Sequence, residues 1–166
     1  MSANAKLAEA LFFMELLDAL DLRQRPLTLE GTPAAEVSYL FGAVLNALYA
    51  ALEHAKPIVG VDAVKAYKKN HPLLGGDGLR NTTIHERHIA PDRAGYIPGD
   101  AAALSLPMRA TPRLVQEQEA AANGPCLPLG DSHYIEFDGI PIDVCEVCLK
   151  AFADIHAFLR THGAVA

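Results

Sequence analysis

The chain has 166 residues, of which 51% are hydrophobic and 20% are charged, so it can bury one proper core. This composition excludes an intrinsically disordered chain. The formal net charge of −6 argues against a broad basic surface that binds nucleic-acid phosphates, although it leaves room for a local pocket. We expect a single domain over residues 1–166.

Three features of the sequence bear on the cellular location. No uninterrupted apolar run reaches the roughly 20 residues that a transmembrane helix needs. The N-terminal segment is apolar but carries Glu9, Glu15, Asp18 and Asp21, which the hydrophobic region of a signal peptide would lack. An odd number of cysteines, three, fits a reducing compartment. The sequence therefore predicts a cytoplasmic protein with no membrane partner.

Two long helices are predicted in the first third of the chain. Apolar residues recur every three or four positions over residues 4–21, which predicts an amphipathic helix. The apolar stripe consists of Leu7, Leu11, Met14, Leu17 and Leu20. Three further bulky residues make the apolar face wider than one core contact requires: Phe12, Phe13 and Leu16. The second helix is expected over residues 33–55, with Thr32 as N-cap and Pro33 at the first helical position. We expect Lys56-Pro57 to end it.

Three further helices follow from the same signals. A short one is expected over residues 62–69 with Asp62 as its N-cap, and another over residues 79–89 after a glycine-rich entry. The last helix is predicted for residues 143–161. Asp143 and Glu146 form a capping-box arrangement at its start, and Gly163 supplies the C-terminal stop.

Between residues 91 and 139 the helical signal fades, and we expect an irregular, partly β insertion. Two segments in it alternate polar and apolar residues as strands do, around residues 103–109 and at residues 134–137. The sequence thus predicts a mainly α fold, a four- to five-helix up-down bundle with a small β-hairpin or loop insertion before the last helix.

The cysteines and most histidines have ordinary structural interpretations. Cys145 and Cys148 form a C-x-x-C pair, a spacing that suits zinc or dithiol chemistry. Both thiols fall on the apolar stripe of the last helix, so core packing is favoured, and a metal site with Cys126 or His133 is the alternative. We expect surface or helix C-cap roles for the histidines outside residues 79–88, which are His54, His71, His133, His156 and His162.

Residues 79–88 carry two arginines, two histidines, an amide and two hydroxyls. An imidazole can transfer a proton to or from a ribose hydroxyl, and a guanidinium offers a planar fork to phosphoryl oxygens. The two histidines at i and i+3 do not match the spacing of a zinc-protease helix, so no metal or other cofactor is predicted. The alternative is a polar helix face that hydrogen-bonds to loops.

The geometry of this segment sets a condition on its chemistry. Residues five apart on a continuous helix diverge by about 140°. Arg80 and His85 can therefore meet only if Arg80 lies in an irregular entry after Gly78, or if two copies of the segment meet across a dimer.

The run Arg80-Asn81-Thr82-Thr83-Ile84-His85 resembles the R-N-x-x-x-H signature of the HEPN superfamily (higher eukaryotes and prokaryotes nucleotide-binding). In a chain of this composition the six-residue form arises by chance about 0.01 times. The resemblance extends to the helix order on both sides of the run and leaves residues 91–139 unmatched.

The resemblance implies a homodimeric helical bundle in which the two motifs face one another. Many members are metal-independent endoribonucleases that leave a cyclic phosphate, often toxins or antiphage effectors, so RNA and an antitoxin are the implied partners. On this chain Arg80 would bind the scissile phosphate, His85 would transfer protons and Asn81 would orient one or both. The remaining substrate-binding candidates in the segment are Thr83, Arg87 and His88. Other members are nucleotide-binding or assembly modules without cleavage, so a non-catalytic nucleotide-binding or dimerisation module is the second hypothesis.

Overall fold

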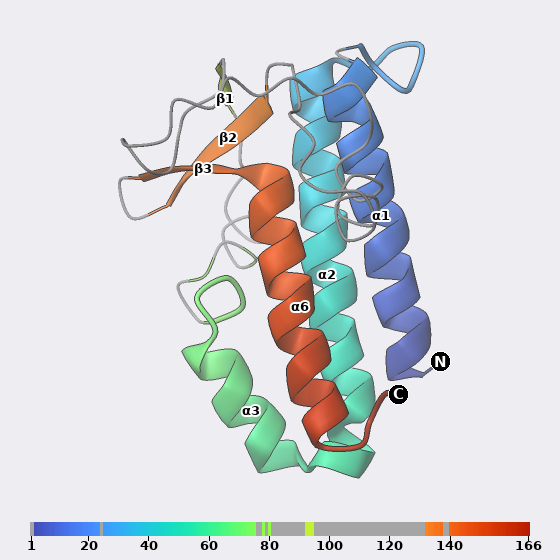
Figure 1. Cartoon of the computed structure of the whole chain (residues 1–166), viewed down its shortest axis with the longest axis vertical. Helices are drawn as coiled ribbons and strands as arrows, with labels where there is room; N and C mark the ends of the chain where they lie inside the picture. Colours follow the sequence, from blue (N-terminus) through green and yellow to red (C-terminus); the bar gives the residue numbers. More distant parts are fainter. Residues whose placement is uncertain are drawn as a thin grey trace, which may run out of the picture.

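The computed structural model describes residues 2–23, 25–75, 78, 80, 92–94, 132–137 and 140–166. These residues form a mainly α fold, as predicted, and a small antiparallel hairpin precedes the last helix (Figure 1). The described helices are α1 (Ala3–Arg23), α2 (Pro33–Val59), α3 (Val61–Asn70) and α6 (Val144–Thr161). The strands are β1 (Asp92–Ala94), β2 (Ser132–Phe137) and β3 (Ile140–Asp143).

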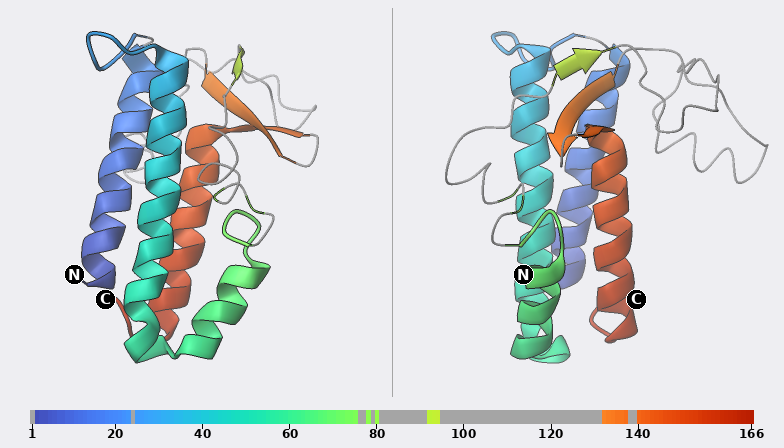
Figure 2. Two further views of the ribbon diagram at one scale, coloured as in Figure 1. Left: turned by 180° about the vertical axis from the view of Figure 1, so that it is seen from behind. Right: turned by 90° about the vertical axis from the view of Figure 1, so that its left-hand side faces the viewer.

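The helices run alternately up and down, with α2 at the centre of the arrangement. α1 and α2 lie side by side and antiparallel, α6 packs against both, and α3 turns back along α2 (Figures 1 and 2). The strands lie at the end of the bundle where α1 stops and α6 starts, and the two chain termini lie at the opposite end (Figure 1).

α1 begins and ends within two residues of the predicted helix. Its buried apolar residues recur at helical spacing and are Ala3, Leu7, Ala10, Met14, Leu17 and Leu20. The prediction that Leu11 belongs to this stripe is wrong, because Leu11 is 37% exposed and the smaller Ala10 faces the core instead. Phe12 is 55% exposed. The wide apolar face of α1 is therefore only partly used inside this chain.

α2 supplies most of the core. Its start is as predicted: Thr32 Oγ1 accepts a hydrogen bond from the Ala35 N–H at 3.3 Å, and Pro33 is the first helical residue. Its largest fully buried side chains are Val37, Phe41, Val44, Leu45, Leu48 and Leu52.

The end of α2 differs from the prediction. The helix continues through Pro57 to Val59, so Lys56-Pro57 does not end it. A proline has a helical φ, but it removes the hydrogen bond to the carbonyl four residues earlier and crowds that carbonyl. The helix ends two residues after Pro57. The chain turns instead at Gly60, whose φ of 99° suits glycine alone. Gly60 is also the N-cap of α3, so Asp62 lies in the first turn and is not the predicted cap.

α2 bears on the expectation that no segment of the chain spans a membrane. Among the described residues it is the one helix that is long and apolar enough to cross a bilayer by length and composition alone. Buried core helices pass the same test, and 61% of its most apolar window is buried inside the bundle.

The last helix and the strand before it lie close to the positions that the sequence predicts. Asp143 Oδ1 accepts a hydrogen bond from the Glu146 N–H at 3.0 Å, and Gly163 ends the helix region with a φ of 70°. β2 contains the strand predicted at residues 134–137 and pairs with β1 on one side and β3 on the other. The strand predicted near residues 103–109 lies outside the described residues, as does the helix predicted at 79–89 apart from Arg80.

The connection between α1 and α2 is held by one buried carboxylate. Glu36 accepts hydrogen bonds from the Leu27 N–H at 2.6 Å, from the Thr28 N–H at 2.8 Å and from the Thr28 hydroxyl. Burial by itself raises the pKa of Glu36, but these donors outweigh it, so the pKa lies below its usual value of 4.5. The ionised form therefore stabilises the fold.

We predict that Glu36→Gln lowers the free energy of unfolding by about 1–3 kcal/mol at neutral pH, the range for hydrogen bonds to a charged group. Because the folded-state pKa is depressed, this contribution is full above the unfolded pKa and is lost as pH falls through the folded value. Urea unfolding of wild type and variant should therefore converge in acid. Glu30→Gln, in the same loop but exposed, is the control. A gap between Glu36→Gln and wild type that does not change with pH would contradict this account.

Candidate functional site

The structure describes one of the six predicted site residues. Arg80 is helical and partly exposed. The other five lie outside the described residues, so their roles stay predictions; they are Asn81, Thr83, His85, Arg87 and His88.

A tight loop that follows α3 positions Arg80. The N–H groups of Leu74 and Gly75 donate to the His71 carbonyl at 3.1 and 2.9 Å, and the Arg80 N–H donates to the Leu73 carbonyl at 3.0 Å. A Cβ on Gly78 would lie 2.7 Å from the Leu73 carbonyl carbon, a distance that backbone atoms cannot accommodate without a shift. Gly78 therefore allows the loop to fold back on Leu73, and this backbone contact sets the position of Arg80.

The guanidinium of Arg80 rests on an aromatic ring of the central helix. Its Cζ lies 3.6 Å from the centroid of the Tyr49 ring, within the range of a cation–π contact. Arg80 Nε is buried and has no hydrogen-bond partner. In the part of the chain that the structure describes, no carboxylate forms an ion pair with Arg80. The side chain is held by its face, and no described acid neutralises it.

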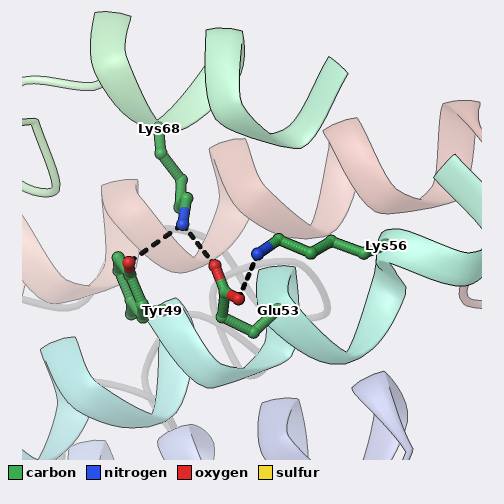
Figure 3. A network of polar contacts seen from close by, with 4 residues as sticks. All are labelled: Tyr49, Glu53, Lys56 and Lys68. Carbon is green, nitrogen blue, oxygen red and sulfur yellow. Dashed lines mark hydrogen bonds and ion pairs between the residues drawn. The ribbon is translucent and has the colours of Figure 1, made fainter. Parts of the chain in front are cut away.

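Tyr49 belongs to a polar cluster between α2 and α3 (Figure 3). Lys68, from α3, donates to the Tyr49 hydroxyl at 2.9 Å and also to Glu53, and Lys56 donates to the other oxygen of Glu53. Lys68 Nζ also lies 4.1 Å from the centroid of the Tyr49 ring, the ring that Arg80 contacts, so three cations and one described carboxylate belong to this cluster. The cluster ties α3 to α2 and leaves a local surplus of positive charge in an acidic protein.

The protonation states in this cluster follow from its contacts. Burial raises the pKa of Glu53, but the hydrogen bonds and charges of Lys56 and Lys68 lower the pKa by more. The pKa of Glu53 therefore lies below its usual value. For Lys68, burial lowers the pKa, whereas the bonds to Glu53 and Tyr49 raise it, and the net shift is upward. Both groups stay charged over the physiological range.

His71 is the C-cap residue of α3, one of the two roles predicted for it, and its side chain is buried. Its Nδ1 accepts a hydrogen bond from the Leu73 N–H at 3.3 Å, so the proton of the neutral ring is on Nε2, which has no hydrogen-bond partner. Burial lowers the pKa of His71, and the charge of Asp154 opposes this only in part. His71 is a neutral structural group that shapes the loop.

His133 differs from its predicted surface or C-cap role. It is 2% exposed, and its Nδ1 lies 2.5 Å from Oδ1 of Asp21, which is 3% exposed. The pair joins the end of α1 to β2. A surface or C-cap role for His133 is therefore wrong. One signal was present in the sequence, since Asp21 follows Leu20 on the apolar stripe of α1, where a charged residue needs a buried partner.

The cysteines of α6 and His162 take roles that the sequence predicts. Cys145 and Cys148 are buried in the core of α6, and burial raises the pKa of the Cys148 thiol far above its usual range, so core packing is confirmed. Cys126 lies outside the described residues. No cluster of metal-binding side chains occurs in the described segments. His162 caps α6, with Nδ1 donating to the Phe158 carbonyl at 2.9 Å.

The chain was compared with protein-family models, curated proteins and solved structures, and none of them matches it.

We predict that the Asp21–His133 pair is energetically coupled. Asp21→Leu and His133→Leu should each lower the free energy of unfolding by about 3–5 kcal/mol, because each removes one member of a buried polar pair. The double variant should cost much less than the sum of the two. Chemical unfolding of the four proteins gives the coupling energy, and strictly additive losses would show that the two side chains do not interact.

Proposed function

We propose that this protein is a metal-independent endoribonuclease of the HEPN type, with Arg80 and His85 at its centre. The observation that supports it best is the state of Arg80. Its guanidinium carbon lies 3.6 Å from the centroid of the Tyr49 ring and has no carboxylate partner in the described segments, and the ammonium group of Lys68 lies 4.1 Å from the same centroid. A phosphate group is the complement to such a site, since a guanidinium binds it through paired N–H donors.

The proposed reaction is an internal transesterification of RNA. The ribose 2′-oxygen attacks the adjacent phosphorus, and the bond from phosphorus to the 5′-oxygen breaks. One proton leaves the 2′-hydroxyl and one reaches the 5′-oxygen, which gives a 2′,3′-cyclic phosphate and a free 5′-hydroxyl. Arg80 stabilises the charge that builds on the phosphoryl oxygens, His85 transfers a proton, and Asn81 orients them. Thr83, Arg87 and His88 contact the substrate.

We further propose that the active form is a homodimer with residues 79–88 at or near the interface. The exposed apolar residues Leu11 and Phe12 on α1 support an apolar contact between copies. From the resemblance alone we extend the proposal to a cytoplasmic toxin or antiphage effector with an antitoxin partner.

The ribonuclease proposal predicts cleavage of a mixed-sequence RNA pool in excess EDTA, with cyclic phosphate ends on the products. His85→Ala should lower the rate by about 10²–10⁴, the usual contribution of general acid–base catalysis. Arg80→Lys should lower it as well, because an ammonium group cannot reproduce the planar fork.

A pool of DNA with the same sequences is the control, because it has no 2′-hydroxyl and should stay intact. If wild type leaves the RNA intact, or if both variants cut as fast as wild type, the ribonuclease proposal fails. Binding of nucleotides without cleavage would then favour the nucleotide-binding or dimerisation module.

The dimer proposal predicts that light scattering at micromolar concentration gives twice the mass of the chain, and that Leu11→Ser with Phe12→Ser shifts the protein toward monomer. Leu29→Ser is the matched control, since Leu29 is a fully exposed leucine in the loop between α1 and α2. A wild-type monomer at this concentration contradicts the proposal.

A further inference from the structure

We infer that Tyr49 is the positioning residue of this site, an inference that rests on the proposed function. Its ring holds the Arg80 guanidinium in the orientation that receives a phosphate, and its hydroxyl is anchored by Lys68. Tyr49 belongs to α2, far along the chain from the R-N-x-x-x-H run, so the motif does not contain it.

Tyr49 is itself held in place from two sides. It lies on the most deeply packed helix of the bundle, and its hydroxyl accepts a hydrogen bond from Lys68 of α3 at 2.9 Å. Lys68 is fixed in turn by Glu53, one turn after Tyr49 on the same face of α2 (Figure 3). The platform beneath Arg80 is therefore set by two helices.

The stacked arrangement has a direct chemical consequence. A guanidinium has its N–H donors in its own plane, so contact through its face leaves the edge donors for a ligand. Because Arg80 Nε is buried, the terminal nitrogens form the part of the fork that an anion would meet. An arginine side chain has several rotatable bonds, and the ring removes much of that freedom before the substrate binds.

The surrounding charge argues against a purely structural contact. A carboxylate at the position of Tyr49 would hold Arg80 more firmly but would also neutralise it. The ring attracts the cation through its quadrupole and leaves the full positive charge to act on an anion. Lys56 and Lys68 add to that charge, and Glu53 offsets only one of the two.

The first test measures the contact without any activity. In a ¹H–¹⁵N spectrum, the Arg80 Nε–H resonance should lie upfield through the ring current of Tyr49, and it is assigned by its absence in Arg80→Lys. Tyr49→Phe, which keeps the ring, should retain the upfield shift, and Tyr49→Leu should abolish it. Tyr39→Leu, at a tyrosine of α2 that is 59% exposed, should change nothing.

The second test measures cleavage of the RNA pool. Tyr49→Leu should lower kcat by about 10²-fold, as a displaced catalytic group does, with little change in KM because Arg80 acts mainly on the transition state. Tyr49→Phe keeps the ring and should retain most of the wild-type rate, which would assign the effect on cleavage to the ring and not to the hydroxyl. Circular dichroism checks that each variant is folded, and Tyr49→Met replaces Tyr49→Leu if the latter is not.

The outcomes separate this inference from the proposed function. A wild-type protein that cuts no RNA overturns the ribonuclease proposal and the catalytic part of this inference, while the spectrum still decides whether Tyr49 holds Arg80. The positioning role is overturned if wild type shows no upfield Arg80 resonance, if Tyr49→Leu retains it, or if folded Tyr49→Leu cuts RNA as fast as wild type.

Discussion

Burial of α2 on several sides is the constraint on which the rest of the structure depends. It packs against α1 and α6, and its buried residues include small ones such as Ala47 and Ala51, which permit close helix packing. The face that remains is polar and carries Tyr49, Glu53 and Lys56 at positions i, i+4 and i+7. Only a helix with matching polar groups can cover that face, and α3 supplies Lys68. The candidate site thus lies where the core helix changes from apolar to polar packing.

Buried polar contacts hold the connections that the core leaves unsupported. Glu36 organises the loop between α1 and α2, and the Asp21–His133 pair fastens the small sheet to the end of α1. Each is a desolvated group whose partners are all close by, so each costs stability if one partner is removed. The apolar core determines which helices pack, and these contacts determine how the intervening segments return to them.

The parts of the fold that follow from local rules could be predicted from the sequence. The 3.6-residue period gave α2 and α6, and the Thr32 and Asp143 caps gave their first residues. The continuation through Pro57 was missed because proline was expected to stop the helix, whereas α2 continues for two residues beyond it. The burial of His133 was missed because its partner, Asp21, is remote in the chain. Arg80 was predicted from its motif, but Tyr49 was not, although the spacing of the polar face on α2 was a usable signal.

Gly60 illustrates a requirement that contacts do not reveal. A side chain at this position would touch nothing within 4 Å, yet its φ of 99° excludes nearly every residue except glycine. The angle between α2 and α3 therefore depends on a glycine whose side-chain position contacts nothing. The placement of Lys68 next to Tyr49 depends on the same residue. During evolutionary divergence such a glycine would be retained on an open surface and could be mistaken for a ligand contact, although selection acts there on backbone handedness alone.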